Sequence, residues 1–424
     1  MKVLQILSIL FFIQGGVYSN EDLPYCTEQR DSIRVDKGGS VTIPCHFSYP
    51  NNTQSTDVRV YWRHAKGGQC GSNEIIYRDT ERWTHKSYEG RISMVGDPQR
   101  ERTATIRIQE LKENDGPMFC CRISIQFNRK SKEEWQTVGG TYIYFKDHIF
   151  VEQPDVVPAM LGEDISIPCV IHNWSPDNIE EIVWRFGKSD LCFENREFLR
   201  WNKQNAPENV GRWMVQKSER SFLLHIMNVT SSDIGQYCCE VNTKNKTEKR
   251  SSAYGSQVVI ADHHQNVTNF TVTQCNIISA NEEDSVTISC SYNDPPGPVP
   301  MWREVFWRVG SPSGPFSYHP SELMVHPSYR GRTQLSGSAD LQINRVRMSD
   351  NTTYYCFVML KFCTGVQKTI SVIKYGIGIQ LKLNSKITRI PIGLQIIIFG
   401  GYIGIKAFLI LISIILSAIY LKKK

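Results

Sequence analysis

The sequence lacks the short motifs on which metalloproteases and serine hydrolases depend. Its ten histidines form no H-E-x-x-H pair and no other paired metal-ligand spacing, and no G-x-S-x-G elbow occurs. Two adjacent histidines, His263 and His264, stand in the polar stretch ADHHQN, which we interpret as a linker. The formal net charge is only +6, and no run of lysine and arginine indicates a nucleic-acid partner. The sequence therefore predicts neither an enzyme nor a nucleic-acid-binding protein, and it indicates no metal or other cofactor.

Cysteine, in contrast, is abundant, and it follows an apolar N-terminus. Residues 1–20 read MKVLQILSILFFIQGGVYSN, with Lys2, an apolar run too short to cross a membrane, and the small residues Val17 and Ser19. We expect a secretory signal peptide over residues 1–19. Secretion makes disulfides the default for the thirteen cysteines. Seven N-x-S/T sequons agree with that route, and they predict glycans at Asn51, Asn173, Asn228, Asn245, Asn266, Asn269 and Asn351.

One sequence unit occurs three times after the signal peptide. Each copy has an alternating strand that ends in cysteine, then a Trp-Arg pair, a Gly-Arg pair, and an aspartate shortly before a final cysteine. The strand cysteines and the tryptophans of the three copies are Cys45, Cys169 and Cys290 with Trp62, Trp184 and Trp307. Four marks that recur in the same order indicate three domains of one fold.

This order of cysteine, tryptophan and D-x-x-x-aromatic-x-Cys resembles immunoglobulin domains. The resemblance implies an all-β fold of three tandem V-type β-sandwich domains, over residues 20–147, 148–261 and 262–384. It implies one disulfide between the two sheets of each domain, at Cys45–Cys121, Cys169–Cys239 and Cys290–Cys356. It also implies a structural salt bridge that closes each domain, at Arg91–Asp115, Arg212–Asp233 and Arg332–Asp350.

The first two copies carry two adjacent cysteines where the third has one. Side chains alternate between the faces of a strand, and the aromatic residue two positions before the last cysteine faces the core. The second cysteine of each pair therefore faces inward, and the first, Cys120 or Cys238, faces outward. Cys70 and Cys192 each lie eight residues after the tryptophan of their domain, so we expect them on the next strand of the same sheet. This spacing predicts outer-face disulfides at Cys70–Cys120 and Cys192–Cys238.

The third copy lacks this second pair, because Pro315 and Tyr355 stand at the corresponding positions. It has Cys275 and Cys363 instead, and we expect these two to join its first and last strands. Cys26 is then left over, and it is free, paired between domains, or bridging two chains.

Arg122 directly follows the core cysteine of the first copy and so faces outward. The corresponding residues are Glu240 and Phe357, so the fold does not require an arginine there. A guanidinium can bind a carboxylate with two parallel hydrogen bonds, a geometry that lysine does not offer. Arg122 is therefore a candidate ligand contact, and a solvated surface arginine is the plain alternative.

The first copy resembles the paired immunoglobulin-like type 2 receptors and, more distantly, the Siglecs. The resemblance rests on GGSVTIPCHFSYP, DVRVYWR, HKSYEGRI, FCCRISI and EEWQTVGGT, in that order. It implies that Arg122 binds the carboxylate of sialic acid on a glycoprotein, with Trp135 and Gln136 beside the sugar on the final strand. An indole there would cover the apolar face of the sugar.

The outer disulfides resemble those of polymeric immunoglobulin receptor relatives, which is a departure from the first resemblance. The alternative to a lectin is therefore a receptor for a protein ligand: an immunoglobulin Fc, a class I-like molecule or an adhesion partner.

A long apolar stretch, residues 392–421, follows a short link at residues 385–391. It is long enough to cross a membrane as a helix, and Lys422, Lys423 and Lys424 place a stub at 422–424 in the cytoplasm. We therefore expect a single-pass type I protein of the plasma membrane, with its three domains outside the cell.

Lys406 interrupts this apolar stretch near its middle. A central lysine costs about 2.5–3.5 kcal/mol on insertion scales, and such residues usually pair inside a bundle. Resemblance to the activating members of the families above implies that Lys406 pairs with an acidic residue of an ITAM-type signalling adaptor. Gly400, Gly401 and Gly404 would let a partner helix approach closely. The alternatives are an unpaired lysine tolerated by local membrane thinning, and an adhesion protein that self-associates without needing Lys406.

Overall fold

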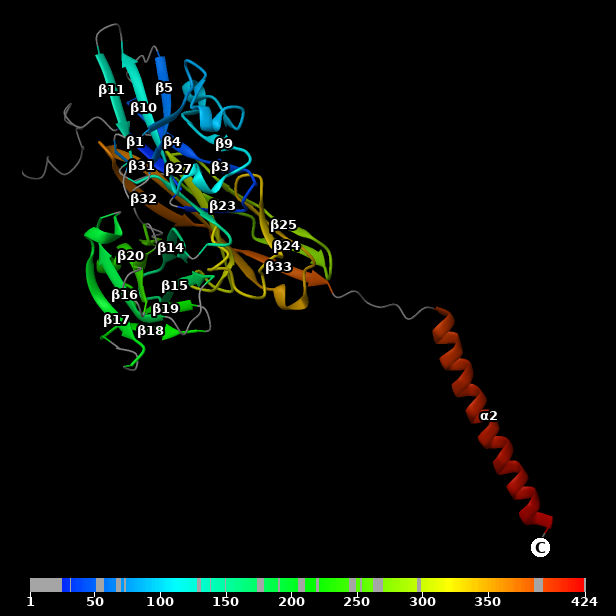
Figure 1. The fold of residues 1–424 in the computed structure, drawn as a ribbon. Coiled ribbons are helices and arrows are strands. Elements are labelled where there is room, and N and C mark those ends of the chain that lie inside the picture. Colours follow the sequence, from blue (N-terminus) through cyan, green and yellow to red (C-terminus); the bar gives the residue numbers. More distant parts are fainter. Residues whose placement is uncertain are drawn as a thin grey trace, which may run out of the picture.

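The computed structural model of the chain has three β-sandwich domains followed by one long C-terminal helix (Figure 1). The residues that it describes are 25–30, 32–50, 57–65, 70–71, 74–127, 131–137, 139–148, 150–173, 179–189, 191–204, 210–218, 221–243, 249–251, 254–261, 270–295, 299–384 and 392–422. The signal peptide expected at 1–19, the link 385–391, Lys423 and Lys424 lie outside these ranges, as do the sequons at Asn51, Asn245, Asn266 and Asn269.

The first domain packs a seven-stranded sheet against a three-stranded sheet. The larger sheet has the order β2-β12-β10-β5-β6-β7, with β11 paired to β10, and the smaller has the order β3-β9-β8. The strands are β1 (Cys26–Gln29), β2 (Ser32–Val35), β3 (Val41–Ile43), β4 (Cys45–Ser48), β5 (Asp57–Ala65), β6 (Glu74–Arg78), β7 (Trp83–Thr84), β8 (Ile92–Met94), β9 (Ile106–Ile108), β10 (Met118–Phe127), β11 (Ser131–Gln136) and β12 (Thr141–Phe145). The helical turns are η1 (Lys86–Tyr88), α1 (Pro98–Glu101) and η2 (Glu113–Asp115).

The second domain repeats this plan with a six-stranded and a four-stranded sheet. Their orders are β14-β22-β20-β16-β17, with β21 paired to β20, and β13-β15-β19-β18. The strands are β13 (Phe150–Glu152), β14 (Val156–Ala159), β15 (Ile165–His172), β16 (Ile179–Gly187), β17 (Arg196–Asn202), β18 (Trp213–Lys217), β19 (Ser221–Ile226), β20 (Gly235–Thr243), β21 (Lys249–Ser251) and β22 (Ser256–Ile260). The turns are η4 (Cys192–Glu194) and η5 (Ser231–Asp233).

The third domain has a six-stranded sheet of order β24-β33-β31-β27-β28, with β32 paired to β31. It faces β25-β30-β29, and β23 pairs with β26. The elements are β23 (Val272–Gln274), β24 (Ile277–Asn281), β25 (Val286–Ile288), β26 (Cys290–Tyr292), β27 (Trp302–Val309), β28 (Phe316–Tyr318), β29 (Thr333–Ser336), β30 (Asp340–Ile343), η6 (Met348–Asp350), β31 (Thr353–Gly365), β32 (Lys368–Tyr375) and β33 (Ile379–Asn384).

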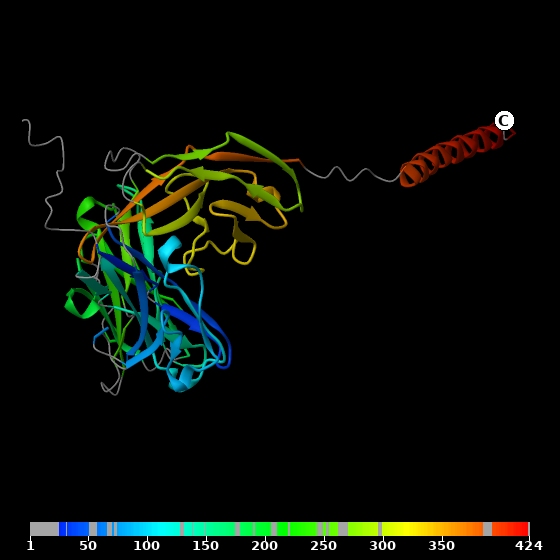
Figure 2. The ribbon, with the colours of Figure 1, turned by 90° about the horizontal axis from the view of Figure 1, so that it is seen from above.

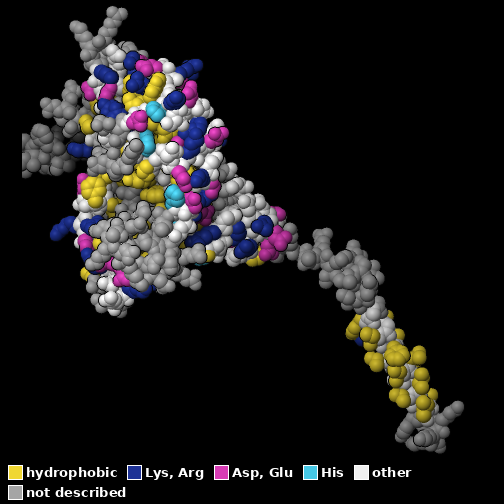
Figure 3. Space-filling view, viewed as in Figure 1, with side chains coloured by type: hydrophobic (Ala, Val, Ile, Leu, Met, Phe, Trp, Pro, Cys, Tyr) yellow, Lys and Arg dark blue, Asp and Glu magenta, His cyan; other side chains and the backbone are white. Residues whose placement is uncertain are grey.

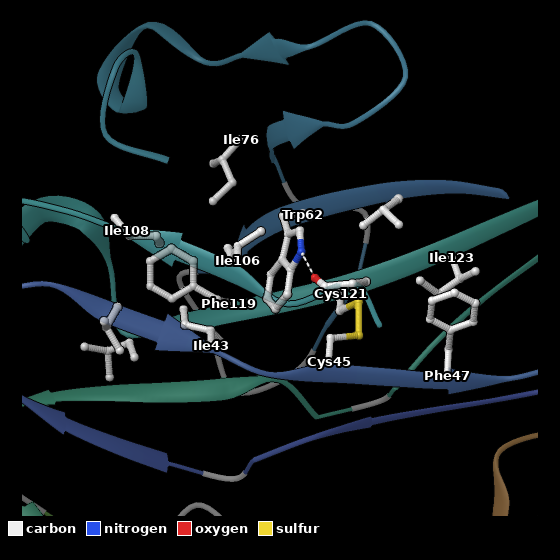
Figure 4. Packing of buried hydrophobic residues seen from close by; sticks show 14 of the residues in the cluster. Ile43, Cys45, Phe47, Trp62, Ile76, Ile106, Ile108, Phe119, Cys121 and Ile123 are labelled. Atoms are coloured by element: carbon white, nitrogen blue, oxygen red, sulfur yellow. Dashed lines mark hydrogen bonds between the residues drawn. A yellow bond between two sulfur atoms is a disulfide. The ribbon is translucent and has the colours of Figure 1, made fainter. Parts of the chain in front are cut away.

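Each core is built around a disulfide that packs on a buried tryptophan. In the first domain Trp62 is fully buried beside Cys45–Cys121, and its Nε1 donates a hydrogen bond to the carbonyl of Ala104 at 2.8 Å (Figure 4). The alternation of Val41-Thr42-Ile43 explains why this strand belongs to a sandwich, because only the two apolar residues face inward. The same arrangement recurs at Cys169–Cys239 with Trp184 and at Cys290–Cys356 with Trp307.

The three structural salt bridges expected from the sequence are formed. Arg91 lies 2.7 Å from Asp115, Arg212 lies 2.8 Å from Asp233, and Arg332 contacts Asp350. The outer-face disulfides Cys70–Cys120 and Cys192–Cys238 are formed as well. We expected Cys70 and Cys192 on the strand that follows the tryptophan strand, and this placement is wrong. Both lie in the connections that precede β6 and β17.

The expected Cys275–Cys363 disulfide is wrong. Cys363 bonds to Cys26, 337 residues away in the first domain, and Cys275 is free and exposed. The neighbouring Gln274 donates to the carbonyl of Tyr354 at 3.3 Å, so Cys275 lies beside the start of β31. Cys363 is near the end of that strand, and nine residues at about 3.3 Å each separate the two positions by roughly 30 Å. A disulfide needs Cα atoms within about 7 Å.

The three domains form a closed triangle, in which the third lies against both others (Figures 1 and 2). The first and third are joined by Cys26–Cys363 and by an ion pair between Lys361 Nζ and Glu28 Oε1 at 2.6 Å. The first and second meet where Tyr254 of the second packs on Tyr142, with ring centroids 6.5 Å apart.

The second and third domains share a buried apolar interface. It contains Phe306, Phe357 and Met359 of the third domain with Val156 and Val259 of the second. One buried ion pair crosses this interface, between Arg308 Nη1 and Glu163 Oε1 at 2.7 Å. Burial of such aromatic side chains stabilises by about 1.5–3 kcal/mol each, so apolar packing dominates this contact.

The C-terminal helix α2 (Ile392–Lys422) has the composition of a membrane span. Residues 401–419 have a mean hydropathy of 2.3 and no buried side chain, and Figure 3 shows them as almost entirely hydrophobic. Within the part of the chain that the structure describes, this is the one helix long and apolar enough to cross a bilayer. The chain is therefore a single-pass membrane protein.

Candidate binding face of the first domain

Three long strands, β5, β10 and β11, lie side by side at the outer end of the first domain (Figure 1). Arg122 on β10 is opposite Tyr61 on β5 and Gln136 on β11. Residues directly opposite in an antiparallel pair project from the same face. Because Cys121 faces the core, these three side chains face away from it. We call Tyr61, Arg63, Arg122, Glu134 and Gln136 the outer face.

Glu134 is the counter-ion of Arg122. The guanidinium Nη2 of Arg122 donates to Glu134 Oε2, and both side chains are 26% exposed. Lys132 contacts the other oxygen of the same carboxylate. Partial burial acts to raise the pKa of Glu134, but the hydrogen bonds from Lys132 and Arg122 outweigh it and lower that pKa to about 2. Glu134 is therefore ionised at any physiological pH, and an acidic ligand of Arg122 has to displace it.

A second guanidinium, that of Arg63, stands on the same face. Arg63 is opposite Cys120 on β10, and its Nη1 donates to the carbonyl of Gly71 at 3.0 Å. Its Nε is buried and has no hydrogen-bond partner among the described residues. Burial and the nearby charge of Arg122 lower the pKa of Arg63, while Glu134 acts in the opposite direction. Arg122 and Lys132 both contact the carboxylate of Glu134, and Arg63 adds a further positive charge, which leaves the outer face with an excess of positive charge. Figure 3 shows basic and acidic side chains interspersed on this end of the molecule.

Trp135 does not lie beside Arg122, and the expectation that it contacts a ligand there is wrong. Its register partner is Ile123, a core residue, so it points to the opposite face from Gln136. Only 6% of Trp135 is exposed, and its Nε1 donates to the carbonyl of Cys26 at 3.0 Å. Adjacent strand residues cannot share one face. The aromatic residue that does share a face with Arg122 is Tyr61, which the sequence analysis missed, although the same alternation applied to VYWRH would have found it.

Gln136 has the orientation expected from the sequence. Its Nε2 donates to the carbonyl of Cys70 at 2.9 Å, which ties it to the outer disulfide Cys70–Cys120. Its Oε1 is buried without a hydrogen-bond partner among the described residues. Gln136 is therefore held directly opposite Arg122, against the outer disulfide.

The equivalent faces of the other two domains are already occupied. In the second domain Glu240 replaces Arg122 and pairs with Arg185 at 3.2 Å. In the third domain Phe357 stands at that position, opposite Phe306, and both are fully buried against the second domain. Of the three positions directly after a core cysteine, only that of the first domain holds an arginine.

Lys406 lies within α2, and its side chain is exposed. Its Nζ lies 4.9 Å from the ring centroid of Tyr402, one helical turn earlier. This cation–π contact accommodates part of the charge without supplying a counter-ion.

Three of the seven sequons fall on described residues. Asn228 and Asn351 are exposed, as a glycan requires. Asn173 is exposed too, but its Nδ2 donates to the carbonyls of Lys146 and His148, at 2.5 Å and 2.8 Å. A glycan on this nitrogen would remove one of these two hydrogen bonds, of which the one to Lys146 joins the second domain to the first.

Comparison with known families agrees with this architecture. The model of the immunoglobulin V-set domain matches residues 28–140 and 152–259, which together make up more than half of the chain. The model of the immunoglobulin domain matches residues 277–359. The chain belongs to the immunoglobulin V-set family.

Two kinds of curated relatives are similar to it. Human sialic acid-binding Ig-like lectin 12 is 26% identical over 239 residues, which cover 54% of this chain and 40% of the lectin. The polymeric immunoglobulin receptor of Equus asinus is 22% identical over 379 residues, 82% of this chain and 45% of the receptor. The human polymeric immunoglobulin receptor is 26% identical over 214 residues, 48% of this chain and 24% of that protein. The chain thus spans less than half of the length of these relatives.

Proposed function

We propose that this receptor binds a sialylated glycan or glycoprotein through the outer face of its first domain, at the plasma membrane. The observation that carries the proposal is the placement of Arg122: it is part-exposed, it projects from the outer face, and its one carboxylate partner, Glu134, also serves Lys132. The similarity to a sialic acid-binding lectin supports it.

The carboxylate of the ligand replaces the carboxylate of Glu134 on the guanidinium of Arg122. Charge-assisted hydrogen bonds of this bidentate kind are roughly twice as strong as neutral ones. Lys132 keeps Glu134 ionised and solvated after the exchange. The phenol ring of Tyr61 offers an apolar surface for the sugar, and Gln136 lies beside it, directly opposite Arg122 on β11. Because a single such site makes few contacts, avidity from clustered ligands sets the strength of binding.

Signalling follows from Lys406. We propose that an adaptor helix with an intramembrane carboxylate pairs with this lysine, because an unpaired charge inside the bilayer is costly and an opposite charge lowers that cost. The exposed helix face at Gly401 and Gly404 has open space around both glycines, so a second helix can approach closely there. Lys406→Leu should keep the chain in the membrane and abolish co-precipitation of the adaptor, whereas Lys422→Leu, at the end of the same helix, should leave co-precipitation intact.

A cell-binding assay tests the ligand proposal. Soluble clusters of the receptor should lose binding to target cells after sialidase treatment, and Arg122→Ala clusters should fail to bind untreated cells. Binding that survives both changes would contradict the lectin function.

A protein ligand is the second candidate, and a specific observation favours it. The polymeric immunoglobulin receptor aligns with 82% of the chain, further than the lectin does, and immunoglobulin is the ligand that its name states. Retained binding after sialidase treatment, together with capture of purified polymeric immunoglobulin, would support this candidate instead.

A further inference from the structure

A cavity of about 350 Å³ lies where the three domains meet. Its walls come from Glu28 and Arg30 of the first domain, Asp155 of the second, and Trp302, Glu304 and Lys361 of the third. It is partly open to solvent and far smaller than a protein ligand requires. It is separate from the outer face, since none of the five outer-face residues lines it.

The third domain directs two side chains into this cavity by strand alternation. Trp302 and Glu304 lie two residues apart on β27, and their partners on β31 are Lys361 and Met359. All four project from the sheet face that packs on the other domains, because the next residue in this series, Phe306, is buried in the interface with the second domain.

The charges around the cavity do not balance. Lys361 pairs with Glu28 at 2.6 Å, and Arg30 lies 3.6 Å from Asp155. Glu304 belongs to neither pair, and its side chain forms no hydrogen bond or ion pair with any described residue. Glu194, at the exposed side of the cavity, accepts a hydrogen bond from Ser189. The cavity therefore holds one uncompensated inner carboxylate.

The lack of a counter-ion is reflected in the pKa of Glu304. Burial is the largest cause that raises this pKa, and the charges of Asp155 and Glu28 raise it further. Arg30 and Lys361 oppose the rise, and the resulting pKa is about 7. Burial raises the pKa of Tyr318, and the charge of Glu304 adds to that effect.

We propose that this cavity binds one organic monocation, a primary ammonium or a guanidinium group, with Glu304 as its counter-ion and Trp302 against its apolar part. A single positive charge balances the inner carboxylate of Glu304. An indole face attracts a cation and covers alkyl carbon at the same time.

A metal ion fits less well. Chelation of a divalent metal needs several oxygen atoms close to one another. Among the residues that the structure describes, the only three side chains near enough to share an ion are Glu113, Asp147 and His148, which are exposed and lie outside the cavity.

The test uses n-butylammonium as the probe and n-butanol as its uncharged match. The full chain is placed in nanodiscs of zwitterionic phosphatidylcholine, and binding is measured by saturation-transfer NMR of the probe, with empty nanodiscs subtracted. The wild type should bind butylammonium and not butanol at pH 7.5. Because Glu304 has to be ionised, binding should weaken on the order of twenty-fold at pH 5.5.

Two variants complete the experiment. Glu304→Gln should lose at least tenfold in affinity, while Glu283→Gln, an exposed glutamate elsewhere in the third domain, should match the wild type. Arg122→Ala should also bind butylammonium normally, which separates this site from the sialoside site. Equal binding of butanol, equal binding by Glu304→Gln, or affinity that does not change between pH 7.5 and pH 5.5 would each overturn the proposal. The pH comparison needs only the wild type, so it decides the matter even if Glu304→Gln does not fold.

Discussion

Arg122 and Phe357 occupy the same position of the repeat, one residue after the core cysteine, but they face opposite surroundings. Arg122 is 26% exposed and projects from the outer face of the first domain, whereas Phe357 is fully buried under the second domain. Each lies opposite an aromatic residue on the neighbouring strand, Tyr61 or Phe306. One sheet face thus serves two purposes in this chain. In the third domain it closes the triangle of domains, and in the first it stays open with a positive charge.

This contrast predicts opposite costs for the same substitution. Phe357→Ala should destabilise the chain by about 3–5 kcal/mol, because it leaves a cavity in the interface between the second and third domains. Arg122→Ala should change stability by less than about 1 kcal/mol, since a part-exposed ion pair contributes little. Chemical unfolding of both variants measures the difference. Similar losses in the two variants would show that the interface is not formed as described.

The disulfide pattern gives a second prediction. Peptide mapping under non-reducing conditions should recover Cys26 linked to Cys363, and Cys275 should react with an alkylating reagent. Replacing Cys26 and Cys363 together by serine should cost about 2–5 kcal/mol, the range for native disulfides of small secreted domains. A Cys275–Cys363 peptide in the native protein would refute the closed arrangement of the first and third domains.

The sequence predicted each domain well and their assembly poorly. Cys45, Trp62 and Cys121 identify a sandwich because local alternation and fixed spacing determine what each residue faces. The same alternation correctly placed Arg122 on the outer face and paired the cysteines of the outer disulfides. Trp135 and Gln136 were placed by a family resemblance, which was extended to two adjacent residues that strand geometry keeps on opposite faces.

Contacts between domains leave no comparable pattern in the sequence. Nothing local to Cys26 indicates that its partner is 337 residues away, because that pairing depends on how three finished domains pack. Glu304 and Asp155 likewise resemble surface acids when read singly. Only the fold brings them to one cavity, and so the junction was missed.

The acid–base behaviour of Glu304 predicts how stability depends on pH. The pKa of this carboxyl is raised from 4.5 to about 7 in the folded chain. An acid whose folded pKa is raised favours the folded state most when it is protonated, below pH 4.5. That advantage is lost as the pH rises toward 7 and stays lost above it. We expect Glu304 to make the chain less stable at pH 7.5 than at pH 5 by at most about 3 kcal/mol.

Urea unfolding of the wild type and of Glu304→Gln at both pH values isolates this contribution. The variant should show a smaller loss between pH 5 and pH 7.5 than the wild type. Identical losses in the two proteins would mean that Glu304 is not buried at a closed junction.

Competition between Glu134 and the carboxylate of the ligand for Arg122 gives a further prediction. If Glu134 is paired with Arg122 in the absence of ligand, Glu134→Gln should strengthen sialoside binding several-fold, because the ligand no longer has to displace a charged partner. Glu133→Gln is the matched control, since Glu133 is exposed on the same strand and has no ion pair with Arg122 among the described residues. Surface plasmon resonance on immobilised sialosides compares the two. Weaker binding by Glu134→Gln would indicate that Glu134 orients the arginine instead of competing for it.

The binding of Arg122 variants to a sialylated glycan surface tests the central claim most directly. Clustered wild-type receptor and three variants, Arg122→Ala, Arg122→Lys and the control Arg59→Ala, are applied to the same surface. Arg59 lies on β5 and is paired with Asp57 at 2.7 Å, so Arg59→Ala changes the net charge as much as Arg122→Ala does but leaves the guanidinium of Arg122 in place. The account predicts loss of binding for Arg122→Ala, strong weakening for Arg122→Lys because a point charge replaces the bidentate group, and retention for Arg59→Ala. Equal binding by wild type and Arg122→Ala would contradict it.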